Sequence, residues 1–297
     1  MGLFFKSKSK DNSETLQNSA KVIAFLNQKG GVGKTTMAFN TASALANQNY
    51  KVLCLDMDPQ GNLSQLLGVD VDETDAPQAY NLLINSIREL KGLHSPVLFQ
   101  DVLVKGKLDL IPSGQALSGF ELSVAGISSP RQMILKRMLE KTGILSQYDY
   151  VVIDGPPTLG LLVVNILCAC DGVMVPFRPD EFSRKGLGNF YDVLEQIEEM
   201  GVTKIPQVLA HIPNLVDLRR KQEGVDLKRI TQDLEDEFGQ GNVVAPFLNK
   251  APLVRSQAQK KSVFDYQSKE FTPLQGQFDQ LAHLITSNNK WEMRSEH

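Results

Sequence analysis

A glycine- and lysine-rich stretch occupies residues 27–36 and reads NQKGGVGKTT. An apolar run that favours a strand, residues 22–26, precedes it, and a run that favours a helix, residues 37–48, follows it. Glycines let successive backbone N–H groups point toward one anion, and a helix N-terminus adds unpaired donors. Lys34 can bind the β- and γ-phosphates, and the Thr35 hydroxyl can bind Mg²⁺. We therefore expect a phosphate-binding loop whose nucleotide contacts come from Gly30, Gly31, Val32, Gly33, Lys34, Thr35 and Thr36.

The loop departs from the ordinary P-loop pattern at one position, because Gln28 stands where the pattern has glycine. Instead, Lys29 directly precedes the glycine pair, where it could contact the nucleotide of its own subunit or of a facing one. This KGGVGKTT form resembles the deviant Walker A box of the ParA/MinD ATPases. The resemblance implies ATP and Mg²⁺ as ligands and catalytic roles for Lys29 and Lys34. The alternative is a glycine-rich turn that binds nothing, but strand, loop, lysine–threonine pair and helix all agree with a nucleotide site.

A pair of carboxylates follows the second expected strand, residues 51–55. Asp56 and Asp58 close that strand, and the sequence continues as Gln-Gly-Asn at residues 60–62. Taken alone, this spacing also fits the start of a turn, because aspartate and proline both favour turns. Beside a phosphate-binding loop it resembles the DxDPQGN box of ParA proteins. The resemblance implies that Asp58 is the carboxylate that takes part in hydrolysis.

A third motif, DYVVIDGPP, occupies residues 149–157. Four apolar or aromatic residues followed by Asp154 are typical of a Walker B strand, which presents a carboxylate to the Mg²⁺ shell. The Gly-Pro-Pro sequence that follows stiffens a loop that can sense the γ-phosphate. We therefore expect Thr35 and Asp154 to be the protein's contribution to the metal site.

Two late segments, residues 208–214 and 243–248, read as further strands. In ParA proteins the ends of these late strands enclose the base, so the resemblance implies Asn214, Pro246 and Phe247 as adenine neighbours. The chain differs from the residues common in the family at two of these positions. Asn214 stands where many members have threonine, and Phe247 stands where many have an arginine after the proline.

Strand and helix patterns alternate along the chain from residue 21 onward, which predicts a doubly wound, mainly parallel α/β sheet. The expected strands are runs of consecutive apolar residues rather than alternating apolar and polar residues, so helices should cover both faces of the sheet. A ligand is then expected at the carboxyl ends of the strands. We expect one P-loop domain over residues 21–287, a flexible tail at 1–20 and a polar tail at 288–297. Besides the strands named above, the pattern predicts strands at 108–113, 150–153 and 172–176, and helices at 80–90, 130–145, 159–170, 181–200 and 271–287.

Composition restricts the class of protein. The 297 residues are 42% hydrophobic, which is enough for a full core, and the formal charge is −3, so nucleic acid would need a local basic patch. Three cysteines, Cys54, Cys168 and Cys170, lie in apolar stretches. This odd, sparse count favours reduced buried thiols in a cytoplasm over disulfides or an iron–sulfur site. His211 is expected to pack in its strand rather than to act in catalysis.

Basic residues cluster late in the chain. In ParA dimers, basic residues in this part bind nonspecific double-stranded DNA, and the resemblance implies the same here. The alternative is a solvated helix face, because acidic residues interleave with the basic ones. The candidates for DNA binding are Arg219, Arg220, Lys250, Arg255, Lys260 and Lys261.

Both ends of the chain carry apolar residues. The N-terminal tail combines Phe4 and Phe5 with basic residues, so it is either a solvated arm or an arm that docks on an acidic partner or a membrane surface. Near the other end, Phe278, Leu281, Leu284 and Ile285 recur at helical spacing. We interpret this stripe as a core-packing helix rather than a membrane anchor.

Together the motifs predict a ParA-like ATPase of the cytoplasm, associated with the nucleoid. The resemblance implies a cycle in which ATP and Mg²⁺ close a sandwich homodimer, the dimer binds DNA, and a ParB-like or cargo-adaptor partner stimulates slow hydrolysis. Two other classes remain open. One is a MinD-like ATPase that cycles on a membrane, and the other is a nucleotide-gated binding module with negligible turnover.

Overall fold

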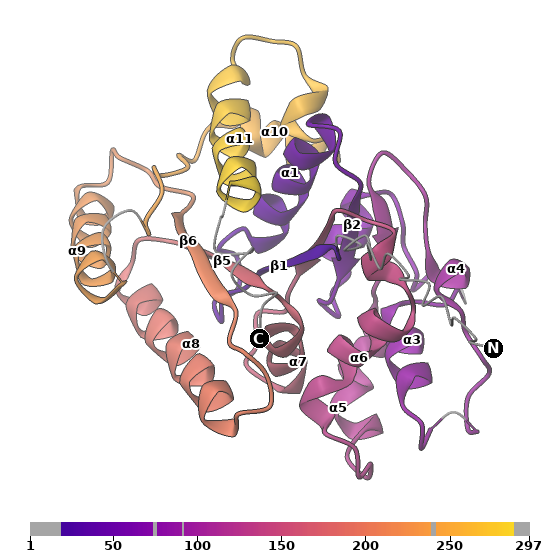
Figure 1. Ribbon diagram of the computed structural model, residues 1–297. Helices are drawn as coiled ribbons and strands as arrows, with labels where there is room; N and C mark the ends of the chain where they lie inside the picture. The colour runs from indigo at the N-terminus through magenta and orange to yellow at the C-terminus, as the bar shows by residue number, and fades with distance from the viewer. Residues whose placement is uncertain (1–18, 74–75, 91, 239–241, 288–297) are drawn as a thin grey trace, which may run out of the picture.

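The computed structural model describes residues 19–73, 76–90, 92–238 and 242–287. Within these residues, six parallel strands form one sheet with the order β3-β2-β4-β1-β5-β6 (Figure 1). This arrangement confirms the expected doubly wound parallel sheet. The strands are β1 (Lys21–Phe25), β2 (Val52–Asp56), β3 (Asp109–Ile111), β4 (Tyr150–Asp154), β5 (Gly172–Phe177) and β6 (Gln207–Pro213).

Helices cover both faces of the sheet, which explains why β2, β4 and β5 are buried at every residue. One face packs against α1 (Lys34–Asn47), α10 (Ala251–Ala258) and α11 (Thr272–Thr286) (Figure 1). The other face packs against α3 (Ala79–Ser86), α5 (Phe120–Ser123), α6 (Ile134–Lys141), α7 (Leu161–Ala169) and α8 (Glu181–Met200). The short helices α2 (Asn62–Leu66) and α4 (Phe99–Val102) and the longer α9 (Lys221–Phe238) complete the outer layers.

The last described helix, α11, confirms the expected core-packing stripe. Phe278, Leu281 and Ile285 are buried, and Leu284 packs partly against the same cluster. The helix lies along α1, so it covers the element that follows the phosphate-binding loop (Figure 1). Among the described residues, no helix is long and apolar enough to cross a membrane.

Residues with reactive side chains lie in the core where the sequence placed them. Cys54, Cys168 and Cys170 are buried thiols. His211 is fully buried within β6, beside the Tyr191 hydroxyl and the aromatic ring of Phe238, which confirms it as a packed strand residue.

Four expected elements are wrong in extent or kind. The helix expected over 80–90 ends at Ser86, and the strand expected over 108–113 spans only Asp109–Ile111. The helix expected over 130–145 is broken into a short 3₁₀ turn (Arg131–Met133), α6 and a second 3₁₀ turn (Ile144–Ser146). Gly143, which adopts a left-handed conformation with φ of 69°, separates α6 from the second turn. The strand expected over 243–248 does not form. The segment contacts β6 through an isolated bridge between Val243 and His211 and through the Phe247 N–H, which donates to the Pro213 carbonyl at 2.8 Å. Leu248 bridges to Val216, beyond the end of β6, and Pro246 has no N–H to extend the pairing.

The boundary of the packed region falls close to the expected residue 21. Ala20, the last residue of the expected tail, is buried, and its N–H donates to the Leu145 carbonyl at 2.7 Å. Residues 1–18 and 288–297 lie outside the described residues, so the expectations for both tails stay predictions.

Strand order brings three loops to one place. From β1 the chain goes outward to β2 on one side and later to β5 and β6 on the other, so β1 lies at the switch in direction. Parallel register aligns Phe25 with Asp154 and Asp154 with Asp56. The loops that follow β1, β2 and β4 therefore meet at the carboxyl edge of the sheet, where doubly wound proteins bind their ligands.

Candidate functional site

The three loops enclose a cavity of about 450 Å³ at the carboxyl edge of the sheet. Residues of all three predicted motifs line it, and Pro157 is the lining residue from the third motif, residues 149–157. Helix α10 and the turn that follows it, which no motif predicted, supply a further wall through Gln257, Ala258 and Lys260. Of the predicted nucleotide and catalytic residues, the cavity is lined by Gly30, Gly31, Gly33, Lys34, Thr35, Thr36 and Asp58.

The backbone of the phosphate-binding loop depends on glycine at two positions. Gly31 and Gly33 have φ of 72° and 90°, in the left-handed region that glycine reaches without strain. A Cβ on Gly33 would lie 2.2 Å from the side-chain nitrogen of Asn214. Gly33 is also the residue before α1, so the first N–H groups of that helix face the cavity side of the loop.

Asn214 connects the end of β6 to this loop. Its Nδ2 donates to the Val32 carbonyl at 2.8 Å, and the side chain is buried. Its Oδ1 is also buried and accepts no hydrogen bond among the described residues. Asn214 therefore holds the loop through its Nδ2, and its Oδ1 is left as an acceptor next to the loop. The predicted contact of Asn214 with the base stays a prediction.

Lys34 is a buried cation at the start of α1. Its Nζ reaches the Lys29 carbonyl at 3.4 Å, which is a weak contact, and it lies near Asp58 and Asp154. Burial lowers the pKa of Lys34, and the two carboxylates oppose that shift. An incoming phosphate would restore the counter-charge and hydrogen bonds that burial has removed.

Asp154 and Thr35 form the expected metal corner. Asp154 is fully buried, and neither of its carboxylate oxygens accepts a hydrogen bond of good geometry from the described residues. Burial raises the pKa of Asp154 well above its usual range and Asp56 adds to the rise, whereas the nearby Thr35 hydroxyl and Lys34 ammonium oppose it. An orphaned buried carboxylate beside a hydroxyl fits a divalent cation.

Most ligands of such a cation would have to come from the nucleotide and water. The described part of the chain holds no group of three or more His, Cys, Asp or Glu side chains that could bind a metal alone. Mg²⁺ commonly keeps several waters and takes only one or two protein ligands together with phosphate oxygens. The Thr35 and Asp154 pair therefore fits Mg²⁺ bound together with a nucleotide.

The loop after β2 is built by Asp56 and carries Asp58. The Asp56 carboxylate accepts hydrogen bonds from the Ser64 N–H at 2.8 Å, the Ser64 hydroxyl at 2.7 Å and the Asp58 N–H at 3.1 Å. Burial raises the pKa of Asp56 to about 7 despite these bonds. Asp58 faces the cavity and accepts from the Gln60 N–H at 3.0 Å. Burial also raises the pKa of Asp58, opposed by Gln60 and Lys34.

Lys29 points away from its own cavity. Its ammonium forms an ion pair with Asp180, which also caps α8 by accepting from Ser183. The exposed ring of Phe182 lies 5.9 Å from the same ammonium. Lys29 is thus held at the rim of the site by an ion pair that is about one-third exposed on each side.

The residues predicted around the base lie on adjacent backbone segments, since the Phe247 N–H donates to the Pro213 carbonyl at 2.8 Å, next to Asn214, but their side chains have different surroundings. Phe247 is buried, and its ring packs against Phe278 at a centroid distance of 4.9 Å, inside the core under α11. Pro246 is half-buried, and its carbonyl accepts from Gln277 at 3.1 Å. Neither Pro246 nor Phe247 lines the cavity. Because the Phe247 ring is buried in the core, only backbone atoms of this segment or the Pro246 ring could contact a base.

The basic residues predicted to bind DNA fall into two groups. Arg219 and Arg220 precede α9 and form ion pairs with Asp217 and Glu223, whereas the other four lie on or beside α10 (Figure 1). Of those four, Arg255 pairs with Glu270. Lys260 lines the cavity itself, which the sequence had not indicated.

Gln257 is a second site residue that sequence reasoning missed. Its side-chain amide donates to the Thr36 hydroxyl across 221 residues of chain. This contact ties α10 to the start of α1. No motif surrounds Gln257, so only the packing of α10 over the loop identifies it.

Comparison with known proteins agrees with this geometry. Residues 20–206 match the AAA domain family AAA_31. An uncharacterized protein of Methanocaldococcus jannaschii is 34% identical over 271 residues, which cover 91% of this chain and 99% of that protein. The chromosome partitioning protein ParA of Caulobacter vibrioides is 38% identical over 183 residues, which cover 61% of this chain and 64% of that protein.

A solved structure from Mycobacterium smegmatis has a similar fold over most of the chain. It is named cobyrinic acid a,c-diamide synthase and holds an ATP analogue and magnesium. Its TM-score is 0.71 at 28% identity, with 91% of this chain and 97% of that chain covered. The chain spans only about half to two thirds of the length of several other curated relatives that it matches.

Proposed function

This chain belongs to the ParA/MinD family of deviant Walker A ATPases, and from that premise we propose that it is a Mg²⁺-dependent ATPase that partitions DNA or positions a cellular cargo. The observation that carries the proposal is the convergence of Lys34, Thr35, Asp58 and Asp154 at one edge of the sheet. Each of these side chains is buried or half-buried, and each has few partners for its charge or hydroxyl. A nucleotide triphosphate with Mg²⁺ supplies the partners that they lack.

The proposed binding step uses the loop and two side chains. The N–H groups of the glycine loop and the Lys34 ammonium bind phosphate oxygens, and Thr35 and Asp154 hold the cation. When bound, Mg²⁺ neutralises the charge that develops on the phosphates. Asp58 lies on the same cavity wall, where it can orient a water molecule for attack on the γ-phosphate. Burial raises the pKa of Asp58, which agrees with its position inside a cavity that excludes most water.

The proposed switch is closure of two subunits face to face. Lys29 lies at the rim, outside its own cavity, and its partly exposed ion pair with Asp180 contributes little stability. The Lys29 side chain can therefore exchange Asp180 for a phosphate of a facing subunit. The closed dimer then binds nonspecific DNA, and a ParB-type or cargo-adaptor partner stimulates hydrolysis and release. The chromosome partitioning name of the Caulobacter relative supports this use.

Two variants test the cycle. Asp58→Ala should bind ATP and form a dimer that persists, because binding residues are intact while water positioning is lost. Lys29→Ala should bind ATP but stay monomeric. Analytical ultracentrifugation with ATP, together with phosphate release, measures both, and Asp192→Ala on the exposed face of α8 is the matched control. A normal ATP-dependent dimer in Lys29→Ala, or unchanged partner-stimulated turnover in Asp58→Ala, would refute the proposed roles.

A membrane-cycling, MinD-like ATPase is the second candidate, based on Phe4 and Phe5 with the lysines that follow them. Co-sedimentation with anionic liposomes, with ATP and with ADP, separates it from the DNA proposal. A binding module without turnover is the third. Phosphate release measured with DNA and a partner protein decides between it and an ATPase.

A further inference from the structure

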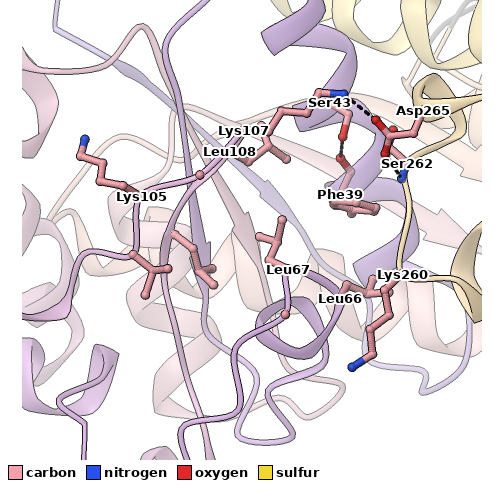
Figure 2. Close-up of a pocket in the computed structure, with 14 residues that line it drawn as sticks. Phe39, Ser43, Leu66, Leu67, Lys105, Lys107, Leu108, Lys260, Ser262 and Asp265 are labelled. Atoms are coloured by element: carbon pink, nitrogen blue, oxygen red, sulfur yellow. Dashed lines mark hydrogen bonds and ion pairs between the residues drawn. The ribbon is translucent and has the colours of Figure 1, made fainter.

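A second cavity of about 330 Å³ adjoins the nucleotide cavity on the β3 side of α1 (Figure 2). We call it the lysine groove, because Lys105, Lys107 and Lys260 line it. Its apolar floor comes from α1, from the end of α2 and from the segment that leads into β3, and polar groups of Ser43, Ser262 and Asp265 also line the groove. The apolar lining residues are Phe39, Leu66, Leu67, Val104, Leu108 and Leu110.

The three lysines surround this floor on different sides (Figure 2). Lys105 pairs with Asp109 at 2.6 Å, and Lys107 pairs with Asp265 at 2.7 Å. Both lysine side chains are more than half exposed, so these ion pairs add little stability and can exchange for another carboxylate. The Lys260 ammonium has no hydrogen-bond or ion-pair partner within the described ranges, which leaves the groove with an excess of positive charge.

Lys260 occupies an unusual backbone position. It follows α10 with φ of 53°, its N–H donates to the Gln257 carbonyl, and the Lys261 N–H donates to the Ser256 carbonyl. This is the Schellman pattern at the end of a helix, in which the left-handed residue is usually glycine. A lysine there carries strain that glycine would avoid, and such strain is found most often at functional sites. A left-handed lysine that lines both cavities is therefore a candidate functional residue.

The groove lies against the nucleotide cavity. Lys260 and Leu66 line both. Leu66 ends α2, and Ser64 in the same helix bonds the carboxylate of Asp56, two residues before Asp58. A partner that docks in the groove is therefore in contact with the helix that adjoins the Asp58 loop.

We propose that the lysine groove binds an acidic segment of a partner protein, with an apolar side chain on the floor and flanking carboxylates on the lysines. This inference rests on the proposed function, since it describes where the partner of that ATPase docks. A concave apolar floor favours a peptide over DNA, because phosphate contacts require positive charge and no apolar surface. Charge complementarity selects acidic over basic flanks.

Fluorescence anisotropy with the full chain tests the inference. The probes are fluorescein-labelled peptides of one design, with a central Leu-Phe pair and flanks that are all acidic, all serine or all lysine. We expect the acidic peptide to bind at least tenfold more tightly than the other two. Lys107→Glu and Leu67→Asp should each weaken it at least tenfold, whereas Lys185→Glu, an equal charge change on exposed α8, should not.

Charge exchange gives a second readout. The double variant Lys107→Glu/Lys260→Glu should lose the acidic peptide and gain the lysine peptide. Lys260→Gly separates binding from folding, because glycine relieves the left-handed strain. It should raise the Tm by about 1–3 °C and still weaken the acidic peptide severalfold.

Three outcomes would overturn the inference: equal binding of all three peptides, an equal loss in Lys185→Glu, or random-sequence duplex DNA that binds through Lys107 and Lys260 while the acidic peptide does not. A fluorescent ATP analogue and phosphate release keep the two proposals apart. Normal ATP binding and hydrolysis without peptide binding refutes the groove alone. Peptide binding that depends on Lys107, in a chain that binds no ATP, refutes the ATPase proposal alone.

Discussion

At the scale of single residues, Lys34 has lost most of its contact with water and has gained only a long contact to the Lys29 carbonyl. A triphosphate would be its strongest partner. Lys34→Ala should therefore lower ATP affinity at least about a hundredfold, or roughly 3 kcal/mol, as expected for removal of one member of a charge-assisted pair. Titration with a fluorescent ATP analogue measures the loss, and Lys51→Ala at an exposed position is the control. Affinity near that of the wild type would exclude the phosphate-binding role.

His211 makes a residue-scale prediction about stability. The Tyr191 hydroxyl lies 2.5 Å from its Nε2, and the Asn242 carbonyl lies 3.2 Å from its Nδ1. A neutral ring with the proton on Nδ1 satisfies both neighbours. Burial lowers the pKa of His211 to about 4, so the folded protein keeps the ring neutral where the unfolded chain binds a proton.

The resulting stability is present above the ordinary pKa of histidine and is lost as the pH falls toward 4. When the pH is lowered from about 7.5 to about 5, this residue should reduce the free energy of unfolding by about 2 kcal/mol. His211→Gln should lack that part of the pH dependence, whereas exposed His283→Gln should keep it. Urea unfolding at both pH values is the measurement, and equal slopes in the wild type and His211→Gln would contradict the assignment.

At the scale of elements, α2 acts as the support for the loop that carries Asp58. Ser64 donates to Asp56 through both its N–H and its hydroxyl, and its hydroxyl oxygen accepts from the Ser113 N–H at 3.0 Å. One side chain thus joins β2, α2 and the residue pair that follows β3. The arrangement positions Asp58 without Ser64 touching the cavity.

Ser64→Ala should therefore slow phosphate release severalfold and leave ATP affinity close to that of the wild type, because Lys34 and Thr35 are unchanged. It should also lower the unfolding free energy by about 1–3 kcal/mol, since a buried carboxylate loses a donor and a buried N–H loses its acceptor. Stopped-flow phosphate release and equilibrium titration separate the two effects, with exposed Ser118→Ala as the control. An equal loss of ATP affinity would show that α2 supports the phosphate loop instead.

At the scale of the whole molecule, a formal charge of −3 provides no general attraction for DNA. Any DNA surface has to be local, and the basic residues near α10 would be brought together with those of a second subunit only in the closed dimer. We therefore expect duplex binding that appears with ATP and is weak with ADP. It should fall steeply with salt, with a log–log slope of about −0.9 for each phosphate contact.

Charge reversal at Arg255, or at Lys260 and Lys261 together, should flatten that slope. Reversal at Lys6 and Lys8 should leave it unchanged if the N-terminal tail is a partner arm. Fluorescence anisotropy of a random-sequence duplex across a salt series, with each nucleotide, measures both. Equal binding with ATP and ADP would mean that the switch does not control DNA, and absence of binding at low salt would favour the membrane alternative.

The amino-acid sequence by itself determined the elements that depend on local patterns. Glycine spacing in residues 30–33, apolar runs that end in Asp56 and Asp154, and the helical stripe of α11 all predicted their structures correctly. Local pattern is sufficient there because φ preference, strand burial and helix periodicity act over a few neighbouring residues. The parallel order of the sheet also follows from the alternation of strands and helices.

Only the tertiary structure decided the contacts between distant segments. Lys29 forms an ion pair with Asp180, and Asn214 donates a hydrogen bond to Val32. The Phe247 ring packs in the core against Phe278, and α10 covers one side of the nucleotide cavity. The tertiary structure also placed Lys260 between two cavities. The physical reason is the same in each case: the partner lies far away in the chain, and the packing of helices on the sheet, not the residue's neighbours in sequence, determines which groups meet.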